Sequence, residues 1–175
     1  HLSASPSQFD SGKLRWINQQ YLKRADDAWL AQAIKPRLIR AGIRAVDLAG
    51  QQAPELAAVC ALLKERASTL NELADSAHMF YVEPRPRADD LAAHMNDSVR
   101  GALVDFARAL EAANWTRESI NACFKPVLAA HGLKMPQLAI PVRLLVFGFA
   151  QTPSVDACLA LMPKAVVVSR LSALA

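Results

Sequence analysis

The chain has 175 residues, of which 53% are hydrophobic and 21% are charged, and its formal net charge at pH 7 is +4. This composition is typical of a globular protein and excludes a disordered one, and the length allows one or two domains with a real core. The longest uninterrupted apolar stretch, LLVFGFA at residues 144–150, is too short to span a bilayer, so we expect no membrane association.

The stretch KLRWINQQYLKR, residues 13–24, predicts an amphipathic helix. Its apolar residues recur at helical spacing, so we expect them to form a face toward a core: Leu14, Ile17, Tyr21 and Leu22. Cations and a tryptophan occupy the remaining positions: Lys13, Arg15, Trp16, Lys23 and Arg24. A basic face with aromatics needs an explanation in a chain that shows no catalytic motif.

Three further helices are predicted before residue 82. Asp26 or Asp27 is the expected cap of the first, and Thr69 is the expected cap of the last. Glu72 follows Thr69 at the spacing of a capping box. The next segment, VEPRPRADD, contains two prolines and is the best candidate for a domain boundary. We therefore expect one helical subdomain in residues 1–82, a linker in 83–88 and a second helical subdomain in 89–175.

The second half also reads as helical throughout. We expect one long helix over residues 89–113, followed by a helix that Thr116 caps and Gly132 ends. A helix with Pro136 at its start comes next. Thr152 is then expected to cap another helix, and the tail from residue 163 is expected to be helical, although its AVVV stretch alone could be a strand. The whole chain thus predicts an all-α fold of about eight helices.

Charge is unevenly distributed along this sequence. Residues 1–44 carry a net charge of +5, residues 45–119 carry −5, and residues 120–175 carry +4. Two basic ends that meet in space would suit a polyanion such as a nucleic acid. The alternative is that these charges only solvate helices.

No catalytic constellation is recognisable in the sequence. The four histidines show no metal-ligand spacing, and no Gly-rich phosphate loop, GxSxG or HExxH motif occurs. We therefore expect a binding protein without a metal or cofactor. Three isolated cysteines form no CxxC pair and favour free, buried thiols in the cytoplasm: Cys60, Cys123 and Cys158. The N-terminal stretch HLSASPSQFD has no signal-peptide core and no initiating Met, so we expect a piece of a longer protein.

Four collinear segments of this sequence resemble the C-terminal half of bacterial glutamyl-tRNA synthetase. They are SPSQFDSGKLRWINQQYLKR, LLKERASTLNELADSAHMFY, NWTRESINACFKPVLAAHGLKMPQLAIPVRLLVFG and QTPSVDACLALM. In that family this half is an anticodon-binding helical cage made of two consecutive helical subdomains. The family's catalytic domain lies upstream of it, and we expect it to be absent from this chain.

The resemblance implies which residues contact tRNA at the N-terminal end. Lys13, Arg15 and Trp16 match a motif whose helix lies along the inner arm of the tRNA. Cations there would neutralise phosphates, and the aromatic ring would pack on ribose or base. A place in the core is an equal alternative for Trp16.

The resemblance also implies an anticodon site. Arg66 matches an arginine that checks the third anticodon base, with a solvated surface arginine as the alternative. Arg143 matches an arginine that approaches the anticodon, although Ile140 stands where the family has a glutamine. The QTPSV stretch matches the family's loop and helix start beside the first anticodon bases, and an ordinary helix cap is an equal alternative for it. The candidate residues of this stretch are Thr152, Pro153 and Val155.

These matches predict that the chain binds the anticodon arm of tRNA(Glu) and catalyses nothing by itself. The parent enzyme would activate glutamate with ATP and Mg²⁺, whereas this part would hold no cofactor. We expect tRNA(Glu) as the partner, no DNA or membrane, a monomer, and a cytoplasmic location. The alternative is a helical protein–protein interaction module whose basic ends are incidental.

Overall fold

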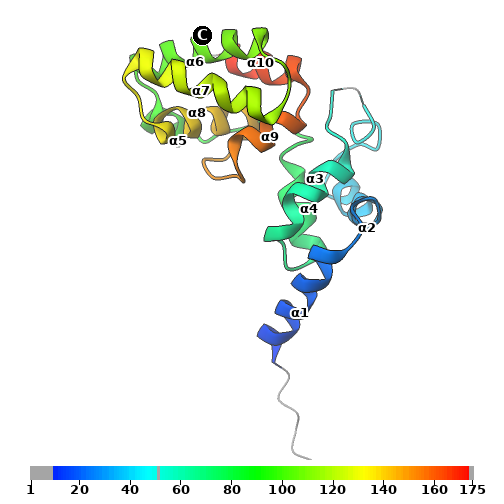
Figure 1. Ribbon diagram of the computed structural model, residues 1–175. Coiled ribbons are helices and arrows are strands. Elements are labelled where there is room, and N and C mark those ends of the chain that lie inside the picture. Colours follow the sequence, from blue (N-terminus) through cyan, green and yellow to red (C-terminus); the bar gives the residue numbers. More distant parts are fainter. Residues whose placement is uncertain (1–9, 51, 174–175) are drawn as a thin grey trace, which may run out of the picture.

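The computed structural model describes residues 10–50 and 52–173 (Figure 1). This described part contains no strand, which confirms the all-α prediction. Its helices are α1 (Ser11–Arg24), α2 (Asp27–Arg40), α3 (Leu56–Leu63), the short 3₁₀ helix η1 (Lys64–Arg66), α4 (Leu70–His78), α5 (Ala88–His94), α6 (Asp97–Ala112), α7 (Arg117–His131), α8 (Met135–Phe147), α9 (Val155–Leu161) and α10 (Lys164–Ser172).

Side-chain caps begin several helices where the sequence predicts them. Asp26 accepts a hydrogen bond from the backbone N–H of Trp29 at 2.9 Å and begins α2. Thr69 accepts from the N–H of Glu72 at 3.1 Å and begins α4. The Glu72 carboxylate accepts in turn from the N–H of Ser68 at 2.9 Å, which is one residue before the position that an ideal capping box uses.

Two predictions about the second half are wrong. The single helix expected over 89–113 is two helices, because the chain leaves helical geometry at Met95 and Asn96. The Asn96 side chain accepts from the N–H of Val99 at 2.9 Å and starts α6. Thr152 does not cap a helix, since α9 begins after Ser154 instead.

Other predictions for the second half are confirmed. Thr116 caps α7 by accepting from the N–H of Ser119 at 3.2 Å, and Gly132 ends that helix. The tail forms α10, so its AVVV stretch is helical.

The helices pack in two groups that share one continuous core. In the first group α2 packs on α3 and α4, and in the second α6 packs on α7 and α10. The groups meet where α3 contacts α9 and where the rings of Phe80 and Phe147 pack edge to face, with centroids 5.4 Å apart (Figure 1). Residues 81–87 join the groups without helical structure. The division at residues 83–88 into two subdomains stays a prediction.

The predicted core face of α1 is mostly exposed, which corrects the expectation from its periodicity. Only Leu22 of this helix is buried, while Leu14 and Tyr21 are 50% and 72% exposed. The helix extends away from the body of the molecule (Figure 1). Periodicity alone identifies an apolar face, but burial of that face depends on a partner element.

Polar contacts attach α1 to the body instead. Arg15 forms an ion pair with Glu72 at 2.7 Å, and Lys23 forms one with Glu65 at 3.6 Å. The Asn18 side-chain amide donates to the backbone carbonyl of Ser68. These contacts join α1 to η1 and to the start of α4.

Candidate nucleic-acid interface

A cleft of about 890 Å³ lies between the two groups of helices. One wall comes from α3, η1 and α4, and the other comes from α8 and from the loop between α8 and α9. Its lining residues are Leu63, Arg66, Asp75, Ser76, Met79, Met135, Pro136, Ala139, Ile140, Arg143, Phe149, Ala150, Gln151, Thr152 and Pro153. The cleft combines mostly apolar side chains with two cations and one carboxylate, which suits a ligand that has both flat rings and polar groups.

The two arginines of the cleft differ in how they are held. Arg66 is the last residue of η1, and its exposed side chain has no hydrogen-bond or ion-pair partner among the described residues. Arg143 is half-buried on α8, and its Nε donates to the hydroxyl of Thr152 at 3.1 Å. That hydroxyl donates to the carbonyl oxygen of Pro153 at 2.9 Å. Arg143 is therefore oriented in advance, whereas the guanidinium of Arg66 is available to a ligand.

Both arginines of the cleft influence the buried thiol of Cys158 on α9. Burial raises the pKa of the Cys158 thiol on α9 to about 11, and the charges of Arg143 and Arg66 oppose that rise. Arg66 belongs to the first group of helices and Arg143 to the second. The fold thus brings two cations that are 77 positions apart in the sequence into one electrostatic environment.

An ion pair between a buried carboxylate and an exposed arginine fixes the helix that follows the cleft loop. Asp156 is only 8% exposed, and its carboxylate accepts from Nε of Arg117 at 2.7 Å and from the hydroxyl of Ser154. Burial alone would raise the pKa of Asp156, but these two hydrogen bonds, a further one from the backbone of Ala157 and the charge of Arg117 together hold the pKa below its ordinary value. Asp156 and Arg117 lie far apart in the sequence, and no sequence signal pairs them.

The structure brings four of the predicted site residues together in the cleft: Arg66, Arg143, Thr152 and Pro153. Ile140 also lines it, at the place where a polar residue was expected from the resemblance. The side chain of Val155, the first residue of α9, is 3% exposed and belongs to the core, so the predicted contact of this residue would come from its backbone N–H and stays a prediction.

The other three predicted residues lie on α1, away from the cleft (Figure 1). Trp16 is 61% exposed, so its alternative assignment to the core is wrong. Lys13 is exposed, and Arg15 shares its charge with Glu72. Any ligand of this helix is therefore bound at a second surface.

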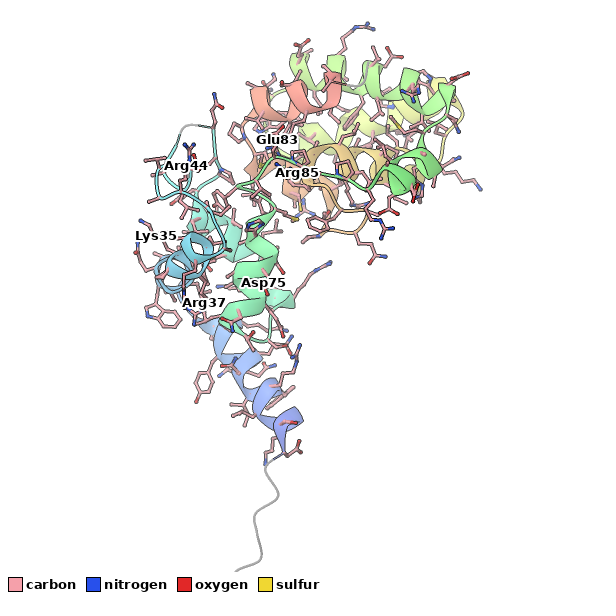
Figure 2. The ribbon with its side chains drawn as sticks, turned by 180° about the vertical axis from the view of Figure 1, so that it is seen from behind. Lys35, Arg37, Arg44, Asp75, Glu83 and Arg85 are labelled. Atoms are coloured by element: carbon pink, nitrogen blue, oxygen red, sulfur yellow. The ribbon has the colours of Figure 1, made fainter. Side chains whose placement is uncertain are left out.

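Sequence reasoning missed two notable residues of the cleft. Asp75 lines the same cleft as the two arginines, and Figure 2 labels it on α4. Phe149 exposes an aromatic ring on the loop after α8. Asp75 lies within a segment that resembles the family but was given no role there, and Phe149 lies outside the four segments; only the packing of the two groups of helices places them in one cleft.

Other predictions concern thiols, metals and membranes. The three cysteines are free; Cys60 and Cys158 are buried and Cys123 is partly buried. Within residues 10–50 and 52–173, no three His, Cys, Asp or Glu side chains are grouped to hold a metal ion. The described helices include none that is long and apolar enough to cross a bilayer.

The curated proteins that match this chain in sequence include glutamate–tRNA ligases of two Burkholderia species. The chain is 55% identical over 173 residues to a glutamate–tRNA ligase of Burkholderia multivorans and 53% identical to that of Burkholderia thailandensis. Each match covers 99% of this chain but 36% of the relative, so the chain spans about a third of the length of the curated relatives it matches.

Solved structures share the fold. A glutamate tRNA ligase from Elizabethkingia meningosepticum, crystallised with its amino acid, superposes with a TM-score of 0.79 at 20% identity, covering 95% of this chain and 32% of that one. The glutamate–tRNA synthetase of Elizabethkingia anophelis superposes with a TM-score of 0.74, also at 20% identity and with the same coverage of both chains. The family described as an anticodon binding domain matches residues 19–175, which is most of the sequence. The chain therefore belongs to the anticodon-binding domain family.

Proposed function

We propose that this chain is the anticodon-binding part of a longer glutamate–tRNA ligase and that it binds the anticodon arm of tRNA(Glu). The cleft between the two groups of helices is the observation that carries the proposal, because it joins Arg66, Arg143 and the loop at residues 149–153. The identity of 55% to a glutamate–tRNA ligase supports the choice of tRNA.

The chemistry of the cleft suits an unpaired RNA loop. Proteins read RNA sequence mostly in loops, where bases are splayed out and their edges are open. A guanidinium can donate two parallel hydrogen bonds to one base edge, and Arg66 has its guanidinium available. Arg66 is thus the residue we assign to the third anticodon base, while Arg143 and Thr152 shape the site for the other bases.

The basic end of α1 would position the same RNA rather than read it. Lys13 and Arg15 would contact phosphates of the arm, and the exposed ring of Trp16 would pack on ribose or base. Such contacts add affinity for every tRNA alike.

In this proposal, catalysis and anticodon binding belong to different parts of the longer enzyme. The ligase would use ATP and Mg²⁺ to attach glutamate to tRNA(Glu), and this part would hold neither and perform neither step. We further propose that it acts as a monomer in the cytoplasm and does not bind DNA.

The test is binding of the chain to a tRNA(Glu) transcript and to a transcript altered only in the third anticodon base, at about 50 mM and about 200 mM salt. We expect tighter binding of the unaltered transcript and a roughly tenfold loss of affinity at the higher salt. Equal binding of both transcripts would leave only a nonspecific basic surface, and no binding would indicate another partner, such as a protein.

Two substitutions test the assigned roles. Arg66→Ala should reduce the preference for the correct third base by roughly tenfold. Lys13→Ala should weaken both transcripts about equally and lower the salt dependence. The site assignment is wrong if both variants bind both transcripts like the wild type.

A further inference from the structure

We propose that Phe149 is a stacking platform on which one unpaired base of the bound RNA lies. The inference rests on the proposed function, since it requires RNA in the cleft. It adds a contact to the face of a base, which the two arginines do not provide.

Exposure of the ring is the first observation. Phe149 is 56% exposed, although burial of an aromatic side chain is normally favourable. Among the described residues, the large apolar side chains that are exposed are Leu14, Trp16, Tyr21, Trp29, Ile39, Val46, Met135 and Phe149. Only Met135 and Phe149 of this group line the cleft, and only Phe149 has an aromatic face.

The backbone before Phe149 is closely packed. Gly148 ends α8 with φ +81°, a conformation that side-chain-bearing residues rarely adopt, and its N–H donates to the carbonyl of Leu144 at 2.9 Å. A Cβ at Gly148 would come within 3.2 Å of the backbone nitrogen of Arg85 on the joining segment. The loop is therefore packed against the segment between the two groups of helices, which keeps Phe149 at the cleft wall.

The neighbourhood of the ring leaves room for a flat ligand. Phe149 lines the main cleft and also a smaller hollow of about 450 Å³ beside the joining segment. Figure 2 shows Glu83 and Arg85 on that segment, and both line the smaller hollow. Phe149 thus borders two open spaces.

Stacking would complement the arginines. Every base has a π face, so stacking on an aromatic side chain adds affinity without selecting the base, whereas Arg66 would select the base through its edge. Loss of one stacked base typically weakens binding about 5- to 100-fold. Phe149 should therefore contribute affinity and leave the preference between anticodons unchanged.

The test compares the whole chain with its variants Phe149→Leu and Phe149→Trp. Leucine keeps apolar area but has no ring face, and tryptophan keeps the face. Phe149→Leu should weaken binding of the tRNA(Glu) transcript at least about fivefold with an unchanged ratio between anticodons, and Phe149→Trp should bind like the wild type. Trp29→Leu is the matched control, because Trp29 is an equally exposed aromatic on α2 outside the cleft.

Fluorescence provides a second readout. A transcript that carries 2-aminopurine at each anticodon-loop position in turn should show quenching on wild-type binding at one position, and Phe149→Leu should lose it. Unchanged affinity and unchanged quenching in Phe149→Leu would overturn the stacking role while wild-type binding stands. If the wild-type chain itself does not bind the transcript, the proposed function fails and this inference with it.

Discussion

Asp156 is the one buried charged residue among the described positions, and it illustrates what single side chains contribute to this site. Its carboxylate joins the start of α9 to the start of α7 through Arg117, and so fixes the helix that follows the cleft loop. Burying an unpaired charge costs several kcal/mol, so the pair matters most when one member is removed. The cleft therefore depends on a residue that does not line it.

Asp156→Asn should destabilise the fold by about 1–2 kcal/mol at neutral pH, since it loses a charge-assisted hydrogen bond to a partner that is more than half exposed. The wild-type pKa is lowered in the folded state, so its contribution is present above the ordinary carboxyl pKa and is lost as pH falls through the folded value. Urea unfolding between pH 7 and pH 2 should show that the difference in unfolding free energy between wild type and variant disappears at the acid end. A difference in unfolding free energy that is independent of pH would contradict the stabilising role of the Asp156 carboxylate.

Elements show clearly what the sequence can and cannot predict. Caps at Asp26, Thr69 and Thr116 were predictable because a cap is a contact across three residues. The exposure of α1 was not predictable, since burial of an apolar face depends on distant elements. The break before α6 carries a local signal, the Asn96 cap, which the helical periodicity of the flanking residues obscured.

The residues of the candidate site also divide into those that the sequence could predict and those that it could not. Arg66 and Arg143 were predicted by resemblance to a family, and their common cleft agrees with that prediction without testing their roles. Asp75 lies in a matching segment without an assigned role and Phe149 lies in none, so no local pattern could place them in the cleft. Val155 shows the reverse case, because its motif match does not reveal that its side chain is buried and that only its backbone can serve a ligand.

The separation of α5 from α6 predicts a local effect of Asn96→Ala. Removing the side-chain cap should cost about 1 kcal/mol of unfolding free energy and speed hydrogen exchange at the amide of Val99, which loses its acceptor. Asn121→Ala is the matched control, because Asn121 is exposed inside α7 and the same substitution there favours the helix. Equal effects of the two substitutions would mean that the cap is not important.

At the scale of the whole molecule, the cleft exists only if the two groups of helices keep their relative position. Arg170 on α10 provides a clamp for this arrangement. Its side chain is 12% exposed and donates to the carbonyl of Val82 at 3.1 Å and to that of Val146 at 2.7 Å. Burial lowers the pKa of Arg170, against the influence of Glu83 at 3.5 Å. One guanidinium thus ties α10, the end of α8 and the start of the joining segment.

Arg170→Met tests the clamp. Methionine fills a similar apolar volume but leaves both carbonyls without this donor, so we expect a loss of about 2–3 kcal/mol in unfolding free energy. Under conditions where the variant is folded, its preference for the correct anticodon should also fall. Arg66 and Arg143 lie on different groups of helices, and the reading of one loop needs both at a fixed separation. Arg100→Met on the exposed side of α6 is the control and should change neither quantity. A variant that is less stable but discriminates anticodons like the wild type would show that the joining segment and the Phe80–Phe147 contact hold the cleft without Arg170.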